Sequence, residues 1–279
     1  MPEAQINGYR MYYEVDGHGP ALVMLHGGLG GGEGGAGLVA NHAAALSSRF
    51  TTVFPDRRGT GSSETPTDGY SIQNYAEDLR GLLDYLGIHR AHVLGSSAGG
   101  PIAMRFALDH PGMTETLLLI NSMSYCQEPE RAVRQQELDQ LRATTRRLGK
   151  AAAVEQALDT RWPGLRQRDP ERFGRLRETN LEQFDGLAKT IQSYLDIGDS
   201  IERRLGELAM PTLIVHGDAD TRIPVACSHQ LHASIRGSQL HIVPGAEHGL
   251  LTNEPEQTRG LVLDFLSQIA RQGQPSAAR

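Results

Sequence analysis

Short apolar runs alternate with amphipathic stretches along most of the chain. The runs predict strands at 9–15, 21–25, 51–54, 91–95, 116–120, 212–216 and 239–243. Apolar residues at helical spacing predict helices at 71–86, 98–109, 225–235 and 255–270. This alternation indicates βαβ units and therefore a parallel sheet. The first strands lie too close together for helical crossovers, so we expect the sheet to begin antiparallel.

The segment from 124 to 208 interrupts this alternation. It contains no convincing strand and holds 15 Lys and Arg against 15 Asp and Glu, together with Trp162, the only tryptophan. We interpret it as a helical insertion between two strands of a core domain, which is formed by residues 1–123 and 209–279. The arginines of this segment are expected chiefly to pair in solvent with its own acidic residues.

Composition narrows the class of protein. The 279 residues carry 27 Lys and Arg against 33 Asp and Glu, a net charge of −6. This mild acidity argues against binding to nucleic acid or to a membrane, so the expected partner is a small-molecule substrate, with a homodimer left open. Cys126 and Cys227 are expected to be buried free thiols. We see neither an apolar run of about 18 residues nor a signal peptide, so a cytoplasmic location is expected.

The strongest chemical motif spans residues 95–99, which read Gly-Ser-Ser-Ala-Gly. It fits the pattern G-x-S-x-G with Ser97 at its centre, and it lies between a predicted strand and a predicted helix, as the motif requires. A sharp turn at this point would expose the Ser97 hydroxyl and present free N–H groups of the helix to a developing anion. Ser97 is therefore the candidate nucleophile.

A serine nucleophile needs a base and a carboxylate that orients the base. His248 follows the last predicted strand and is the candidate base, because Ser…Asp…His is the chain order expected with this motif. Asp220 follows the strand at 212–216 and is the candidate acid. Asp218 is its rival, interpreted instead as a turn residue. The strand at 116–120 ends in Asn121 and therefore offers no acid there.

An oxyanion intermediate needs two N–H donors. Ala98, directly after the nucleophile, supplies the first candidate donor. The loop that begins at His26 and reads His-Gly-Gly-Leu-Gly supplies the second, which we assign to Gly28, with Leu29 as the alternative. His26 is expected to brace this loop rather than to transfer protons.

A rival interpretation comes from Gly30, Gly32 and Gly35, which match G-x-G-x-x-G, with Asp56 at the end of the next predicted strand. This is the outline of a dinucleotide-binding site. We disfavour it because Gly30 lies five residues beyond Leu25, too far for a tight turn. It would also leave the Ser, His and Asp set unexplained. No metal-binding spacing is present, so neither a metal nor another cofactor is expected.

Taken in order, these motifs resemble the α/β-hydrolase family over nearly the whole chain. Five segments carry the resemblance: the oxyanion loop from His26, the D-x-R-G-x-G-x-S loop at 56–63, the nucleophile elbow at 95–99, the acid loop at 216–224 and the G-x-x-H loop at 245–248. The resemblance implies an α/β fold whose mostly parallel, eight-stranded sheet is flanked by helices, with a helical cap after the sixth strand. It also implies a serine hydrolase that works through an acyl-enzyme.

The motifs leave the substrate open. The loops resemble those of proline iminopeptidases, but Leu29 and Ala98 stand where that group has Pro and usually Trp. Hydrolases that cleave carbon–carbon bonds of ring-fission products typically have Asn-Ser-Met where residues 96–98 read Ser-Ser-Ala. We expect first that the substrate is a carboxylic ester or lactone. The alternative in which the protein is not primarily an enzyme is a ligand sensor with slow turnover on the same fold. The expected pocket residues are Met123, Tyr125, Trp162, Phe173, Phe184 and Tyr194.

Overall fold

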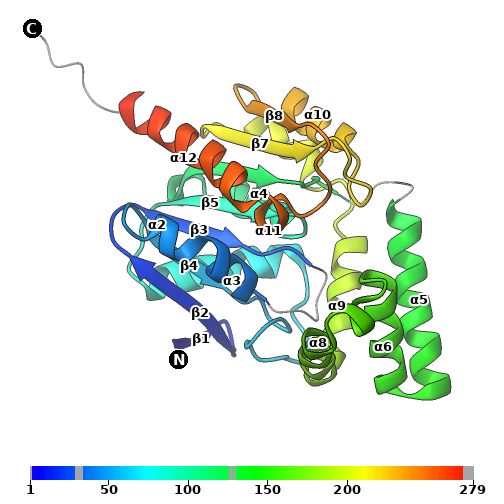
Figure 1. The fold of residues 1–279 in the computed structure, drawn as a ribbon. Coiled ribbons are helices and arrows are strands. Elements are labelled where there is room, and N and C mark those ends of the chain that lie inside the picture. The colour runs from blue at the N-terminus through cyan, green and yellow to red at the C-terminus, as the bar shows by residue number, and fades with distance from the viewer. Residues whose placement is uncertain (1, 29–33, 126–127, 129, 273–279) are drawn as a thin grey trace, which may run out of the picture.

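A computed structural model describes residues 2–28, 34–125, 128 and 130–272 of the chain. Its strands form one sheet in the order β1-β2-β4-β3-β5-β6-β7-β8 (Figure 1). They are β1 (Glu3–Ile6), β2 (Tyr9–Gly17), β3 (Ala21–Leu25), β4 (Thr51–Pro55), β5 (Ala91–Ser96), β6 (Thr114–Ile120), β7 (Thr212–Gly217) and β8 (Gln239–Val243). Strand β2 is antiparallel to β1 and β4, and the other neighbours are parallel. The predicted fold class and the antiparallel start of the sheet are confirmed.

Strand β1 is the element of the sheet that hydrophobic patterning did not predict. Ile6 pairs with Tyr9 across a two-residue loop, in which Asn7 and Gly8 have φ angles of 46° and 85°. Two successive positive φ angles are typical of the type I′ turn that joins right-twisted strands, and Asn-Gly is its preferred sequence. The Asn-Gly dipeptide was therefore the signal that could have placed β1.

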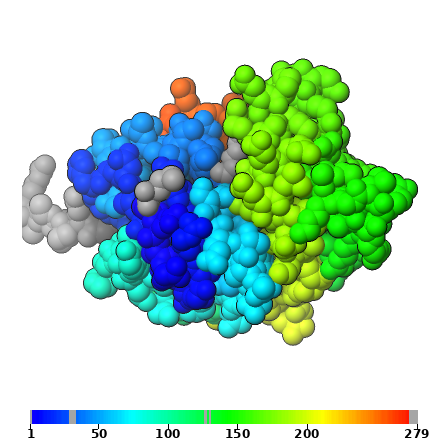
Figure 2. All heavy atoms as spheres, turned by 90° about the horizontal axis from the view of Figure 1, so that it is seen from below, coloured from blue at the N-terminus to red at the C-terminus, as the bar shows by residue number. Residues whose placement is uncertain are grey.

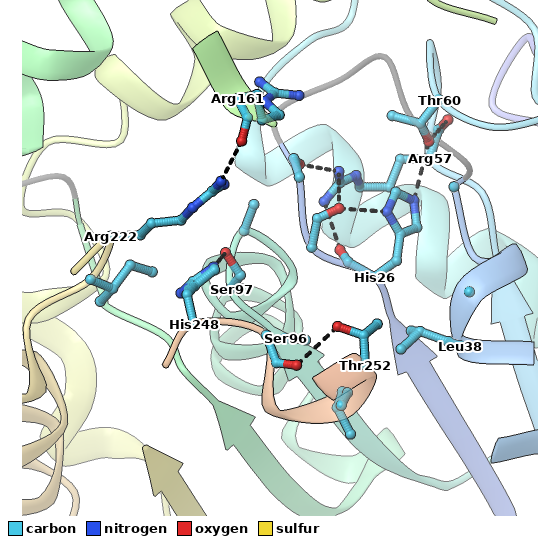
Figure 3. Close-up of a pocket in the computed structure, with 18 of the residues that line it drawn as sticks. His26, Leu38, Arg57, Thr60, Ser96, Ser97, Arg161, Arg222, His248 and Thr252 are labelled. Carbon is cyan, nitrogen blue, oxygen red and sulfur yellow. Dashed lines mark hydrogen bonds between the residues drawn. The ribbon is translucent and has the colours of Figure 1, made fainter. Parts of the chain in front are cut away.

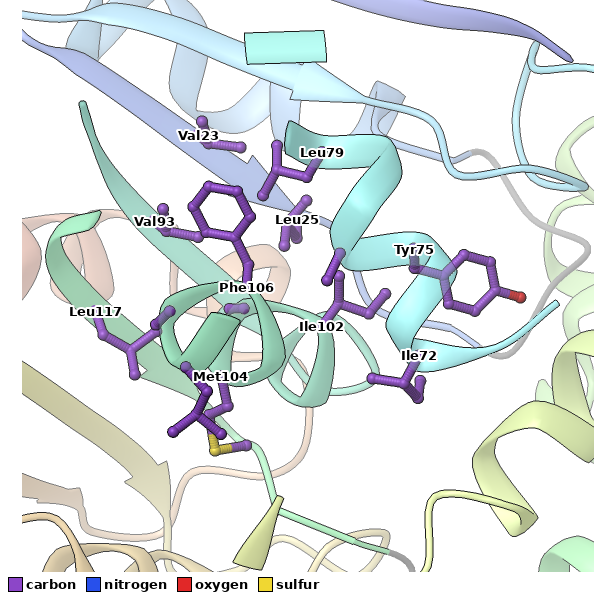
Figure 4. Close-up of a cluster of buried hydrophobic side chains, with 14 of the residues drawn as sticks. Val23, Leu25, Ile72, Tyr75, Leu79, Val93, Ile102, Met104, Phe106 and Leu117 are labelled. Carbon is purple, nitrogen blue, oxygen red and sulfur yellow. The ribbon is translucent and has the colours of Figure 1, made fainter. Parts of the chain in front are cut away.

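Helices cover both faces of the sheet. One face carries α3 (Ile72–Tyr85), α4 (Gly99–Asp109) and α10 (Val225–Ser234), and the other carries α1 (Ala36–Leu38), η1 (Val39–Ala43), α2 (Ala44–Leu46), α11 (Leu250–Asn253) and α12 (Pro255–Gln272). Along β3, Val23 and Leu25 pack on the first face, whereas Leu22 and Met24 pack on the second. Figure 4 shows Val23 and Leu25 against α3 and α4. Burial on both faces explains why this strand is apolar at every position.

The chain between β6 and β7 forms a separate group of helices. We call them the inserted helices: α5 (Glu130–Leu148), α6 (Lys150–Arg161), α7 (Leu165–Arg168), α8 (Pro170–Glu182) and α9 (Phe184–Leu195). They pack around an apolar cluster of their own. Figure 2 shows them as one green mass against the residues of the 50–80 region. Lys189 Nζ donates to the Thr67 carbonyl over 2.6 Å across this boundary.

Two short 3₁₀ segments complete the described elements, η2 (Pro111–Met113) and η3 (Glu202–Glu207). Within the described ranges, none of the helices has the length and apolar character needed to cross a membrane. Cys227 is buried, as predicted, whereas Cys126 lies outside the described residues.

Candidate active site

Ser97 occupies a sharp turn between β5 and α4. Its φ angle is 50°, a left-handed conformation that costs a non-glycine residue free energy. The Ser97 N–H donates to the Ile120 carbonyl over 2.9 Å, which ties the turn to β6. A Cβ atom added to Gly95 would lie only 2.5 Å from the Gly99 carbonyl oxygen. The glycines of the motif are therefore required by close backbone approach.

The structure brings the predicted serine, histidine and aspartate into one hydrogen-bonded row, of which Figure 3 shows Ser97 and His248. His248 Nε2 lies 3.0 Å from Ser97 Oγ, and His248 Nδ1 lies 2.7 Å from Asp220 Oδ2. A carboxylate can only accept, so the imidazole proton is on Nδ1, and Nε2 is left to accept from the serine hydroxyl. This tautomer is the one that a general base needs in order to take the proton of Ser97.

The carboxylate of Asp220 is held in its ionised form. Burial alone would raise its pKa, but hydrogen bonds from His216 and His248, the charge of His248 and the N–H of Ile223 together hold the pKa well below its usual range. Its Oδ1 atom accepts from the backbone N–H groups of Arg222 and Ile223 at 2.8 and 2.9 Å. Asp220 therefore keeps a fixed negative charge against the imidazole.

Asn121 is a residue of this site whose role sequence reasoning did not predict. Its Nδ2 donates to Asp220 Oδ2 over 2.9 Å, and its Oδ1 accepts from the Leu250 N–H at 3.3 Å. It thus joins the acid to the loop that carries the histidine. Its position at the end of a sheet strand was the available signal. The rival acid, Asp218, accepts instead from the Gly245 N–H at 2.6 Å, which is the contact of a turn residue.

Two backbone N–H groups face the same site. Those of Gly28 and Ala98 make no hydrogen bond to any residue that the structure describes, and both residues line the cavity beside Ser97. A Cβ atom on Gly27 would lie 3.0 Å from the Ser97 Cβ, so the loop abuts the nucleophile. Leu29, the alternative donor, lies outside the described residues.

His26 and Arg57 are buried behind this loop. His26 Nδ1 donates to the Gly27 carbonyl over 2.7 Å, and its Nε2 lies 3.2 Å from the Thr60 hydroxyl. Burial, followed by the positive charge of Arg57, lowers the pKa of His26 to about 3. A histidine that stays neutral and fully hydrogen-bonded is suited to bracing the loop, as expected for His26.

A cavity of about 300 Å³ lies between this site and the inserted helices. Of the described residues that line it, none is an aspartate or a glutamate, and five are arginines: Arg57, Arg134, Arg161, Arg172 and Arg222. The arginines of the insert were expected to pair with acids in solvent. Some do, since Arg166 and Arg177 both pair with Glu155, and Arg134 pairs with Glu137 over 2.8 Å although it also lines the cavity.

Two of the cavity arginines lie on the side of Ser97 that faces the inserted helices. Figure 3 shows the Arg222 side chain reaching past Ser97 and His248 toward Arg161, and its Nη2 donates to the Arg161 carbonyl over 3.0 Å. Burial lowers the pKa of Arg161 to about 10, with Arg134 and Arg222 adding to the shift and Glu137 opposing it. Arg134 is ion-paired with Glu137, whereas the described residues that line the cavity around Arg161 and Arg222 include no carboxylate.

The predicted pocket residues divide into two groups. Met123, Trp162 and Tyr194 line the cavity. The prediction for Phe173 and Phe184 is corrected, because both are buried in the apolar cluster of the inserted helices. Tyr125 is not among the described lining residues either, since it packs against the core between the sheet and α10. Apolar spacing in the insert could not separate side chains that pack from those that face the cavity.

Asp56, the acidic residue of the rival dinucleotide-binding interpretation, makes structural hydrogen bonds instead. Asp56 accepts from the N–H groups of Gly35 and Ser62 at 2.6 and 2.7 Å, so its oxygens serve its own loops. Burial raises its pKa to about 6 despite these two hydrogen bonds. Gly30 and Gly32 lie outside the described residues.

Comparison with known proteins agrees with this geometry. Residues 20–255 match the family model described as alpha/beta hydrolase fold, and the chain belongs to this family. It is 32% identical to a protein named carbamate hydrolase RutD from Caulobacter sp. (strain K31), over 96% of this chain and 98% of that one. It is 26% identical to 2-hydroxy-6-oxo-6-phenylhexa-2,4-dienoate hydrolase from Burkholderia cepacia, over 95% and 94%.

Among solved structures, the enol-lactonase from Burkholderia xenovorans LB400 superposes with a TM-score of 0.79. The sequence identity is 26%, covering 95% of this chain and 100% of that one. These relatives are hydrolases with different names, and the chain is an enzyme of the same α/β-hydrolase class. Their diversity leaves the bond that is cleaved to be argued from the site itself.

Proposed function

We propose that the protein is a serine hydrolase that cleaves a small carboxylic ester or lactone through an acyl-enzyme. Ser97 attacks the carbonyl carbon, and His248 takes the serine proton and returns it to the leaving group. Asp220 holds the imidazole and stabilises its charged form. Water, activated by His248, then releases the acid. The observation that carries this proposal is the row of hydrogen bonds from Ser97 through His248 to Asp220, at 3.0 and 2.7 Å.

The oxyanion of each tetrahedral intermediate is assigned to the N–H groups of Gly28 and Ala98. Both are free of described partners and lie in the same cavity as the nucleophile. Donors that are already in position need no rearrangement as the negative charge develops. The inserted helices act in this proposal as a cap, which closes the cavity and supplies its remaining wall.

The arginines support a substrate that carries a carboxylate. Guanidinium groups bind carboxylates through paired hydrogen bonds, and each has five N–H donors, so an existing contact does not exhaust it. Arg161 and Arg222 lie together in the cavity with Arg134 nearby, and burial, followed by repulsion from Arg134 and Arg222, lowers the pKa of Arg161 against the opposing charge of Glu137. An anionic group bound there would relieve this repulsion.

A carbon–carbon hydrolase is the second candidate. The relative from Burkholderia cepacia is named for a dienoate, an acid, and the electropositive cavity of this chain suits such a substrate. The same serine, histidine and aspartate would act on a ketone carbonyl instead of an ester.

The test is hydrolysis of p-nitrophenyl esters from acetate to decanoate by the wild type and Ser97→Ala. Turnover that is lost in Ser97→Ala is expected. A matched pair, mono-p-nitrophenyl glutarate and its methyl ester, measures the preference for a free carboxylate, and we expect the charged ester to have the higher kcat/KM. Absence of ester turnover together with Ser97-dependent cleavage of a ring-fission product would favour the second candidate. Absence of both would overturn the proposal.

A further inference from the structure

Arg57 is a buried cation that has no role in the proposed reaction as described above. Its side chain belongs to a residue that is only 5% exposed, yet it lines the cavity. No carboxylate of a described residue forms an ion pair with it, and its Nε atom is buried without a described hydrogen-bond partner. Burying an unpaired charge costs free energy, so its position calls for a physical explanation.

The hydrogen bonds of Arg57 are concentrated on the loop that carries the candidate oxyanion donor. Its Nη1 donates to the His26 carbonyl over 3.1 Å, and its Nη2 donates to the Gly28 carbonyl over 2.7 Å. Nη2 also lies 3.5 Å from the Gly27 carbonyl. In a planar trans peptide the N–H points away from the carbonyl. Holding the Gly27 carbonyl on the side of Arg57 therefore directs the N–H of Gly28 away from it.

A side chain of the inserted helices completes this arrangement. Tyr194, on α9, is fully buried, and its hydroxyl oxygen accepts from Arg57 Nη1 at 3.3 Å. The same hydroxyl donates to the carbonyl of Ala98. The Tyr194 hydroxyl thus connects the inserted helices to both segments that supply the candidate oxyanion donors. It contacts the Ala98 segment directly, and it contacts the Gly28 loop through Arg57.

We propose that Arg57 and Tyr194 are positioning residues that hold the two halves of the oxyanion hole in register and make its geometry depend on the docked inserted helices. The proposal rests on the proposed function, because it assigns a purpose to the same N–H groups. Among the described residues, the charge of Arg57 is met by the loop carbonyls and the Tyr194 hydroxyl, and no carboxylate forms an ion pair with it. An oxyanion forming beside this loop would add a favourable charge interaction with Arg57, so Arg57 favours the transition state over the bound substrate.

The test compares Tyr194→Phe, which removes one oxygen atom, with Tyr70→Phe. Tyr70 is a matched control because its buried hydroxyl lies near Gly186 of α9 but has no hydrogen-bond partner among the described residues. For Tyr194→Phe we expect kcat on p-nitrophenyl esters to fall about ten-fold while KM changes by less than about two-fold. Phenylboronic acid, which forms a tetrahedral adduct with an activated serine, should bind more weakly by a similar factor. Tyr70→Phe should change none of these quantities.

Arg57→Lys extends the test, because lysine keeps the charge and loses the forked geometry. We expect a larger fall in kcat than for Tyr194→Phe. The double variant should lose less than the product of the two single losses, since the two side chains share one contact, whereas the contact of Tyr194 with the Ala98 carbonyl does not involve Arg57. A fall in kcat below two-fold for Tyr194→Phe, additive losses in the double variant, or a change in KM alone would each overturn the link.

Hydrogen exchange separates failure of this link from failure of the proposed function. The peptide covering residues 22–28 should exchange faster in Tyr194→Phe than in the wild type or in Tyr70→Phe. If the wild type hydrolyses no ester, the proposed function fails, while faster exchange still supports the contact between the inserted helices and the loop. If the wild type hydrolyses esters but Tyr194→Phe changes neither the exchange rate nor kcat, the positioning role of Arg57 and Tyr194 is overturned and the proposed function stands.

Discussion

The candidate site at the ends of the strands and the inserted helices differ in the kind of side chain that each presents to the cavity. At the ends of the strands, Ser97, His248 and Asp220 are short side chains, each fixed by hydrogen bonds of 3.0 Å or less. On the opposite wall of the cavity, the inserted helices present long charged side chains such as Arg134 and Arg161. A bond-breaking site needs fixed geometry, whereas a wall that recognises one charged group can use longer side chains. In the proposed function, the residues at the ends of the strands therefore carry out the chemistry, and the insert contributes to the choice of substrate.

The largest expected effect is a fall in kcat when the candidate acid at the end of the sheet is replaced. Asp220→Asn should lower kcat by about 10³- to 10⁴-fold, because an amide can donate to Nδ1 and so stabilise the wrong imidazole tautomer. Asp218→Asn, two residues away and bonded only to a turn, should change kcat less than about three-fold. Steady-state kinetics on one p-nitrophenyl ester measures both variants. Equal losses in the two would contradict the assignment of the acid.

A smaller effect concerns stability as the pH falls. The pKa of His26 is lowered to about 3 in the folded protein by burial and by Arg57, whereas the pKa of an unperturbed histidine in the unfolded chain is about 6.5. Between these values only the unfolded state binds the proton, so His26 contributes stability above pH 6.5 that is lost progressively toward pH 3. From pH 7 to 4.5 this loss amounts to roughly 2–3 kcal/mol.

Urea unfolding at the two pH values measures this effect. The drop in unfolding free energy should be smaller by that amount in His26→Gln than in the wild type. His89→Gln, which replaces an exposed histidine, is the control and should leave the drop unchanged. Identical drops for wild type and His26→Gln would show that the buried imidazole is not held neutral.

The third prediction tests two cavity arginines, of which Arg161 belongs to the insert and Arg222 to the loop after β7. Arg161→Gln and Arg222→Gln should each lower the preference for mono-p-nitrophenyl glutarate over its methyl ester by about ten-fold, the loss of one charge-assisted contact. Arg175→Gln removes the same charge from an exposed position of α8 outside the cavity and should leave the preference unchanged. A uniform loss in all three variants would mean that overall charge, not the cavity, attracts the substrate.

The same contrast explains what could be predicted from the sequence. Each strand that carries the site is apolar and short, and the turns after them have glycine patterns with few alternatives, so residues such as Ser97 could be placed with their partners. The insert offers only a helical period with many polar residues. The helical period alone does not distinguish Phe173, which packs among the inserted helices, from Trp162, which lines the cavity. Arg57 could not be singled out for a related reason, because the carbonyls that it contacts come close to it only in the folded chain.

The most direct test of the central claim is covalent labelling of the nucleophile. The protein is treated with a fluorophosphonate, which phosphonylates an activated serine, and is then analysed by intact-mass and peptide mass spectrometry. The account predicts one adduct per chain on the peptide that contains Ser97, no adduct in Ser97→Ala and a much slower reaction in Asp220→Asn than in Asp218→Asn. An unlabelled wild type, or an adduct that persists in Ser97→Ala, would contradict it.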